Sequence, residues 1–136
     1  MKKQLTILLL AILAIGLTAC ATGPSEPQSL EEQLAARDYI FGEKVDRIRN
    51  YRINGWSEID NRHVIINAGV RDKYLLVLRN SCNNLSSATN LAFTSTAGSL
   101  TDFDKIMVSG PGGFVDHCFI QGIYLIKSIE NKEPGR

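Results

Sequence analysis

The feature that most limits the fold of this chain is a series of short apolar segments separated by turn residues, starting near residue 52. The first three segments are residues 52–59, 63–68 and 74–78. Asp60 and Asn61 suit the first turn because their side chains can hydrogen-bond the local backbone, and Gly69 suits the second because it accepts a positive φ. Segments of this length joined by such short turns predict an antiparallel meander.

Further apolar segments continue the pattern toward the C-terminus. We expect additional strands at residues 91–94, 105–108 and 118–126, with residues 109–113 as the loop between the last two. The unbroken apolar run from Leu75 to Leu78 indicates a central strand. Residues 80–90 are rich in Asn and Ser, which predicts a loop with one helical turn near residues 85–89.

A short helix is expected before the strands. Ser29 and Glu32 have the spacing of a capping box, and Gly42 supplies a stop. These signals predict a helix from Leu30 to about Phe41. The whole pattern therefore predicts a mostly β fold, a small antiparallel barrel or sandwich of about six strands with one short N-terminal helix.

The N-terminus looks like an export signal. Lys2 and Lys3 precede an apolar run, residues 5–16, that is too short to span a bilayer. The sequence L-T-A-C at positions 17–20 resembles the lipobox of bacterial lipoproteins, which predicts cleavage before Cys20 and a lipid on that residue. Position 21 is Ala and not Asp, which is similar to cargo for the outer membrane in the Gram-negative sorting rule. We therefore expect an anchor in the inner leaflet of the outer membrane, with the protein facing the periplasm.

Four regions follow from this pattern. They are a signal peptide (1–19), the lipidated cysteine with a flexible tether (20–29), a single small β-rich domain (30–130) and a disordered tail (131–136). After loss of Lys2 and Lys3 the chain has 13 basic and 14 acidic residues. A net charge this close to zero creates no global field that would attract nucleic acid, so we expect no nucleic-acid partner.

Cysteine usage agrees with an exported domain. Once Cys20 is assigned to the lipid, Cys82 and Cys118 are the two remaining thiols in an oxidising compartment. We expect them to form a disulfide bond, the alternative being two free buried thiols. Neither cysteine belongs to a C-x-x-C pair, so metal and redox roles are disfavoured and no cofactor is expected.

Several segments together resemble a known family. They are W-S-E-I-D-N-R-H at 56–63, Y-L-L-V-L at 74–78, Ser81 with Cys82, L-T-D-F-D at 100–104, and H-C-F-I at 117–120. Over residues 45–129 the chain is similar to the uncharacterised small bacterial lipoproteins grouped as domain of unknown function 6491. The resemblance implies an envelope lipoprotein and no established activity.

One segment combines cationic and aromatic side chains. Arg47, Arg49, Tyr51, Arg52 and Trp56 lie within ten residues, and strand alternation would place the first three on one face. Guanidinium groups recognise carboxylates and phosphates, and exposed aromatic rings stack on sugars or peptides, so this surface suits an anionic envelope protein or polymer. In the alternative interpretation the aromatic residues belong to the core and the arginines keep an edge strand soluble.

Two functional hypotheses remain open at this point. The first is a non-enzymatic binding or structural accessory of the cell envelope, because the sequence holds no convergent catalytic motif. The second is a small periplasmic hydrolase or metal-dependent enzyme that uses His63 and His117 with Asp102 and Asp104. The second requires these four residues to meet in one pocket. In its absence His63 simply opens a strand, His117 flanks the disulfide, and the two aspartates belong to a solvated face or turn.

Overall fold

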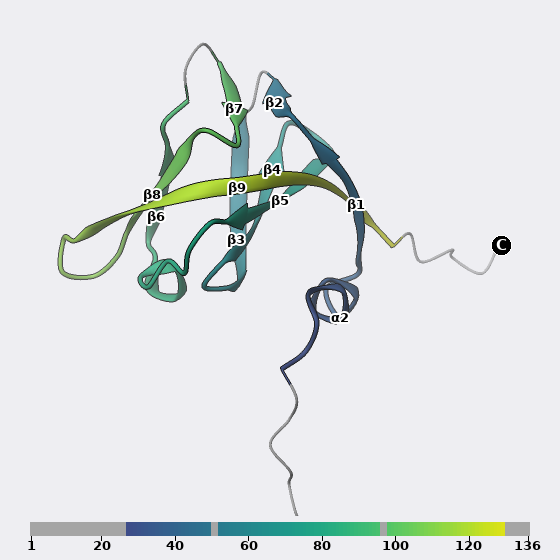
Figure 1. Cartoon of the computed structure of the whole chain (residues 1–136), viewed down its shortest axis with the longest axis horizontal. Helices are drawn as coiled ribbons and strands as arrows, with labels where there is room; N and C mark the ends of the chain where they lie inside the picture. The colour runs from purple at the N-terminus through teal and green to yellow at the C-terminus, as the bar shows by residue number, and fades with distance from the viewer. Residues whose placement is uncertain (1–26, 50–51, 96–97, 130–136) are drawn as a thin grey trace, which may run out of the picture.

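The computed structural model describes residues 27–49, 52–95 and 98–129 and shows a curled, mostly antiparallel β structure with one short helix (Figure 1). The regular elements in order are α2 (Leu30–Ala35), β1 (Tyr39–Val45), β2 (Arg47–Arg49), β3 (Ile53–Asp60), β4 (His63–Ala68), β5 (Asp72–Leu78), the 3-10 turn η1 (Leu85–Ser87), β6 (Asn90–Phe93), β7 (Ser99–Thr101), β8 (Lys105–Ser109) and β9 (Val115–Ser128). The predicted mostly β fold with a single N-terminal helix is confirmed.

The main sheet has the strand order β3-β4-β5-β9-β8-β6, and β1 also pairs with β9. β8 pairs with the first part of β9, whereas β1 and β5 both pair with its last part, residues 123–126, and therefore lie on its two edges. β2 and β7 form a separate two-stranded ribbon. The long strand β9 crosses the molecule and joins its two halves, so the sheet curls into a half-barrel around one side (Figure 1).

The predicted extent of the helix is wrong. The capping box forms as expected, since the Glu32 amide donates to Ser29 Oγ at 3.3 Å and the Ser29 amide donates to Glu32 Oε2 at 3.0 Å. However, α2 ends at Ala35, and Asp38 has a φ of 60° that turns the chain into β1. Pairing with β9 decides the conformation of β1. Local preference would allow these residues to continue the helix, but β9 offers hydrogen-bond partners to their backbone in the extended form.

Gly42 has a different role from the one expected. It does not end the helix but lies inside β1, where the register with β9 shifts between Phe41 and Lys44. A Cβ atom added at Gly42 would collide with the carbonyl oxygen of Leu125 on β9. The bulge therefore brings the two backbones closer than any side-chain-bearing residue allows.

Two apolar clusters cover the two faces of the sheet. The larger one fills the concave inner side and consists of Ile48, Val64, Ile66, Ala68, Leu76, Leu78, Cys82, Leu85, Leu100, Ile106, Val108, Cys118, Ile120 and Ile123. The smaller one lies on the outer side, where Leu34 of α2 packs with Ile65, Leu75 and Ile126. Neighbouring residues of β4 and β5 thus belong to opposite clusters, which explains the unbroken apolar run of β5 and confirms it as a central strand.

Replacing Leu34 with alanine will test how much α2 contributes to stability. Leu34 is fully buried and is the residue that joins the helix to the outer cluster. We expect the free energy of unfolding to fall by about 2 kcal/mol, at the low end for a buried Leu→Ala change because a six-residue helix can shift to fill the space. Urea unfolding measures the effect. Leu30→Ala, a partly buried position on the same helix, should cost less than half as much, and equal losses would contradict the packing.

Tyr74 gives the fold a dependence on alkaline pH. Burial in the inner side of β5, and secondarily the nearby Asp72 carboxylate, raise the pKa of Tyr74 above its ordinary 10.0. The unfolded chain then loses this proton first, so the contribution of Tyr74 to stability is complete below about pH 10 and is lost as the pH rises through the folded pKa. We expect Tyr74→Phe to lose less stability between pH 8 and about pH 11 than the parent protein. Urea midpoints across this range decide it, and parallel curves for the two proteins would contradict the expectation.

Candidate functional site

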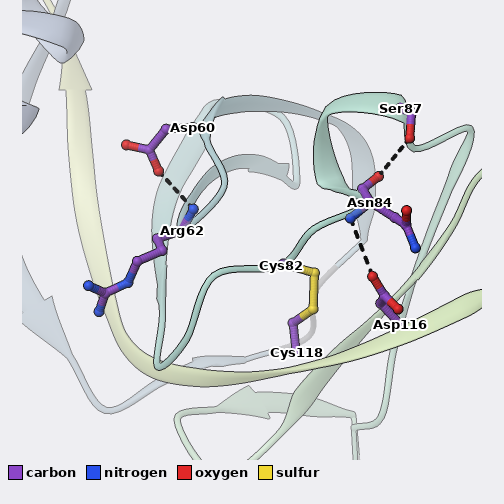
Figure 2. The surroundings of a disulfide bond; sticks show 7 residues. All are labelled: Asp60, Arg62, Cys82, Asn84, Ser87, Asp116 and Cys118. Atoms are coloured by element: carbon purple, nitrogen blue, oxygen red, sulfur yellow. Dashed lines mark hydrogen bonds between the residues drawn. A yellow bond between two sulfur atoms is a disulfide. The ribbon is translucent and has the colours of Figure 1, made fainter. Parts of the chain in front are cut away.

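Cys82 and Cys118 form a disulfide bond, as the sequence predicts (Figure 2). Their Cα atoms are 5.9 Å apart, which is within the normal range for a bridge, and the two residues are 1% and 8% exposed. The bond joins the loop after β5 to the first half of β9, and both cysteines belong to the inner cluster. Its position indicates a structural cross-link that fixes this loop against the sheet.

Polar contacts hold the loop on either side of the bridge. The Cys82 amide donates to the Asn61 carbonyl at 2.8 Å. The Asn84 amide donates to Asp116 Oδ2 at 3.3 Å (Figure 2). The first contact ties the loop to the β3–β4 turn and the second ties it to β9. On sequence alone Asp116 is a candidate third metal donor beside the two histidines, but its carboxylate accepts a backbone amide of the loop instead.

Arg62 joins the same turn to two more strands. Its guanidinium donates to the Leu78 carbonyl at 3.2–3.3 Å and to Gln121 Oε1 at 3.3 Å, which connects the β3–β4 turn to the end of β5 and to β9. A guanidinium that is already shared between a backbone carbonyl and a side-chain amide has a positioning role in the fold. Sequence reasoning gave Arg62 no role, because its acceptors come from segments far away in the chain.

His63 serves the turn at the start of β4. Its Nδ1 lies 2.8 Å from Asp60 Oδ1, and the same carboxylate accepts the Arg62 amide at 2.7 Å. Asp60 thus closes the β3–β4 turn by accepting from two successive residues, as the turn chemistry of Asp predicts. This geometry accounts for His63 without a substrate or a metal ion.

The structure does not bring the two histidines together. His63 pairs with Val77 on β5, Val77 pairs with Gly122 on β9, and His117 lies five residues before Gly122. Strand spacing places the histidines roughly 17 Å apart along the strands and 10 Å apart across them. Among the described residues, no group of three or more His, Cys, Asp or Glu side chains could hold a metal ion. The enzyme hypothesis that required this convergence is therefore not supported by the arrangement.

The two aspartates of that hypothesis lie in the turn between β7 and β8, as the alternative interpretation expected. Asp104 Oδ2 accepts the backbone amide of Thr101 at 2.8 Å and its hydroxyl at 2.9 Å. Asp104 is thus committed to the turn. Phe103, between the two aspartates, is 90% exposed and contributes nothing to the core. An aromatic side chain in a tight turn has no neighbouring strand to cover it.

The cationic segment divides between the surface and the core. Arg47 and Arg49 are exposed on one side of β2, whereas Ile48 between them is buried, and Arg52 is exposed at the start of β3. Trp56 packs against the inner cluster. Tyr51 lies outside the described residues. Within the described parts of the chain, the three arginines make no ion pair with a neighbouring carboxylate.

Two further features of the fold each contain one acidic side chain. A pocket of about 270 Å³ lies beside the bulge of β1, lined by Ile40, Phe41, Gly42, Glu43, Leu125 and Lys127. On β3, Glu58 Oε2 is buried without a hydrogen-bond partner among the described residues. Each feature offers a single carboxylate, and a single carboxylate supplies neither an acid–base pair nor a metal site.

Comparisons with known proteins place the chain in a group without an assigned activity. The model of a family described as "Family of unknown function (DUF6491)" matches residues 1–133. No curated protein and no solved structure matches the chain. Among the described residues, no helix is both long enough and apolar enough to cross a membrane. Residues 1–26, which include Cys20, the predicted signal and most of the predicted tether, lie outside the described residues, as do residues 131–136 of the predicted tail.

Proposed function

Because the chain belongs to the DUF6491 family, whose function is unknown, we propose that it is a lipid-anchored accessory of the bacterial cell envelope that binds an anionic partner. In this proposal Cys20 carries the lipid in the inner leaflet of the outer membrane, and the β domain faces the periplasm. The cationic surface formed by Arg47, Arg49 and Arg52 contacts the partner, an envelope protein or polymer. The domain itself catalyses no reaction.

The observation that carries the proposal is the disulfide bond in a chain that also has an L-T-A-C sequence at positions 17–20. Disulfides persist outside the reducing cytosol, so the Cys82–Cys118 bond supports export. Two or three acyl chains hold a protein on a bilayer effectively permanently, whereas one chain binds only reversibly. Export and acylation together support a domain that works at a membrane surface.

The geometry of β2 supports the anionic partner. Arg47 and Arg49 project from the same side of a strand, and the antiparallel register with β7 places Thr101 opposite Arg47 and Ser99 opposite Arg49. Two guanidinium groups therefore stand beside a row of hydroxyl-bearing residues, without a carboxylate in an ion pair among the described residues. Such a surface suits phosphate or carboxylate groups, since guanidinium binds both through paired hydrogen bonds.

Acylation is tested with Cys20→Ser expressed in a Gram-negative host. The parent chain should incorporate labelled palmitate and fractionate with the outer membrane, and Cys20→Ser should lose the label completely. Ser25→Ala, in the tether, is the matched control and should keep both properties. Ala21→Asp should keep the label but move the protein to the inner-membrane fraction. A parent protein that retains Met1 or carries no acyl mass would overturn the anchor.

The binding surface is tested with a photo-crosslinker placed at Ser99, opposite Arg49. In cells we expect an adduct with one envelope protein or polymer, and Arg47→Gln with Arg49→Gln should lower its yield at least about tenfold because each charged contact contributes substantially. Arg71→Gln, an exposed arginine in the β4–β5 turn, is the control and should leave the yield unchanged. No adduct at Ser99, or an equal loss with Arg71→Gln, would contradict the assignment.

A further inference from the structure

One half of the outer side of the sheet is uncovered and partly apolar. The inner cluster contains Cys118 and Ile120 of β9, so the residues that alternate with them point outward. These outward residues and their cross-strand partners on β8 and β6 form what we call the bare hairpin face: Asn90, Ala92, Lys105, Met107, Ser109, Val115, His117 and Phe119. Phe114, 75% exposed in the β8–β9 loop, adjoins it.

The two halves of the outer side differ in what covers them. At the other end of β9, Ile126 is 3% exposed because it packs with Leu34 of α2. On the bare hairpin face, Val115 and Phe119 are each 49% exposed. In Figure 1 α2 and the β8–β9 hairpin lie toward the two ends of the long strand β9. The same side of one sheet is therefore covered by a helix at one end and left open at the other.

We infer that the bare hairpin face and Phe114 dock on the surface of the bilayer, which rests on the proposed lipid anchor at Cys20. The chain from Cys20 to Leu30, the start of α2, is short and spans at most about 36 Å when fully extended. This chain enters the domain through α2, on the outer side that also carries the bare face. An anchored domain is thus held within reach of the bilayer on the side where its apolar residues are uncovered.

The charges around the face suit a lipid surface. Lys105 Nζ lies 5.8 Å from the centre of the Phe119 ring, so a cationic group stands over this exposed aromatic side chain. Aromatic and aliphatic side chains bordered by Lys and Arg are typical of interfacial segments that bind anionic lipid head groups. The nearest acid on β9, Asp116, alternates with the face and its carboxylate accepts the Asn84 amide instead.

Tryptophan quenching tests the docking. The full chain, purified from the envelope, is placed in vesicles of phosphatidylethanolamine and phosphatidylglycerol with brominated acyl chains. Trp56→Phe removes the native fluorophore, and Phe114→Trp or Val70→Trp supplies a new one. Val70 is the matched control, because it is 97% exposed but lies in the β4–β5 turn away from the face. We expect bromine quenching at position 114 to exceed that at position 70 by about threefold or more.

The outcomes separate docking from anchoring. Intact mass of the same samples reports acylation independently of the fluorescence. If the protein is acylated but quenching is equal at the two positions, docking is overturned and the anchor stands. If the protein has no acyl mass but is still quenched more strongly at position 114, docking is supported and the anchor is overturned. A third outcome is equal quenching in a protein that self-associates in sedimentation experiments and loses this self-association with Phe114→Ser. That outcome would assign the face to a second copy of the chain and would also overturn docking. Since Phe114 is largely exposed, its replacement leaves the core intact, and every fluorescent variant carries the same Trp56→Phe change.

Discussion

Replacing both Cys82 and Cys118 with alanine will lower the free energy of unfolding by about 4 kcal/mol. The bond closes a segment of 36 residues, and restricting the unfolded chain over that length accounts for a loss of this size in the chain-entropy model. A small domain has only about 5–15 kcal/mol of net stability, so the loss removes a large part of it. We expect the melting temperature to fall by about 20 °C in thermal unfolding followed by circular dichroism.

A reductant supplies the control for this change. Alanine is used because both positions belong to the apolar inner cluster, where a serine hydroxyl would be buried without a partner. Unfolding the parent protein with dithiothreitol should give nearly the same loss, and the reductant should not affect the double alanine variant. If the melting temperature of the parent protein is the same with and without the reductant, the bridge does not contribute to stability as we expect.

Gly42→Ala should be the most damaging single change in β1, costing about 3 kcal/mol. The added Cβ would overlap the carbonyl oxygen of Leu125, and a backbone atom in a paired strand cannot rotate away as a side chain can. Relief requires β1 to separate from β9, which also opens the contacts of Phe41 and Tyr39 with the outer cluster. Urea unfolding gives the free energy, and hydrogen exchange of the β1 amides shows where the structure opens.

The matched control for this prediction is Gly55→Ala on β3. A Cβ at Gly55 would lie 3.4 Å from Asn67 Nδ2, the end of a flexible side chain, so this change should alter stability by less than about 1 kcal/mol. Both glycines have no positive φ and lie inside strands, which leaves the backbone approach as the difference between them. A similar cost at the two sites would contradict the role that we assign to the Leu125 carbonyl.

The strands that the sequence predicted are those whose signals are local. Residues 63–68 form β4 with the same bounds as expected, and the turn at Asp60 and Asn61 and the η1 turn follow the expected chemistry. β1 and β7 were missed, and β2 was anticipated only as an edge strand that carries arginines, because each acquires its structure from a distant partner: β1 from β9, and β2 and β7 from each other. Short segments without a clear alternation carry no local signal that outweighs a helix or loop.

The site residues show the same division. The pairing of Cys82 with Cys118 follows from counting cysteines once Cys20 is set aside for the predicted lipid, so the sequence was sufficient for it. The separation of His63 and His117 depends on strand order and register, and no pattern within either segment contains that information. The bare hairpin face could not be found for the same reason, since it combines residues of β6, β8 and β9 that only the register aligns.

By itself, the sequence determined the mostly β class of the domain, through alternating strands and tight turns that depend on neighbouring residues, and the pairing of Cys82 with Cys118. Only the tertiary structure decided that the sheet curls and stays open, that α2 covers one half of its outer side, and that Gly42 marks a bulge and not a helix end. The physical reason is the distance along the chain over which each interaction acts. Alternation and turn chemistry act over a few residues, whereas strand pairing and burial are settled between segments that are far apart in the chain.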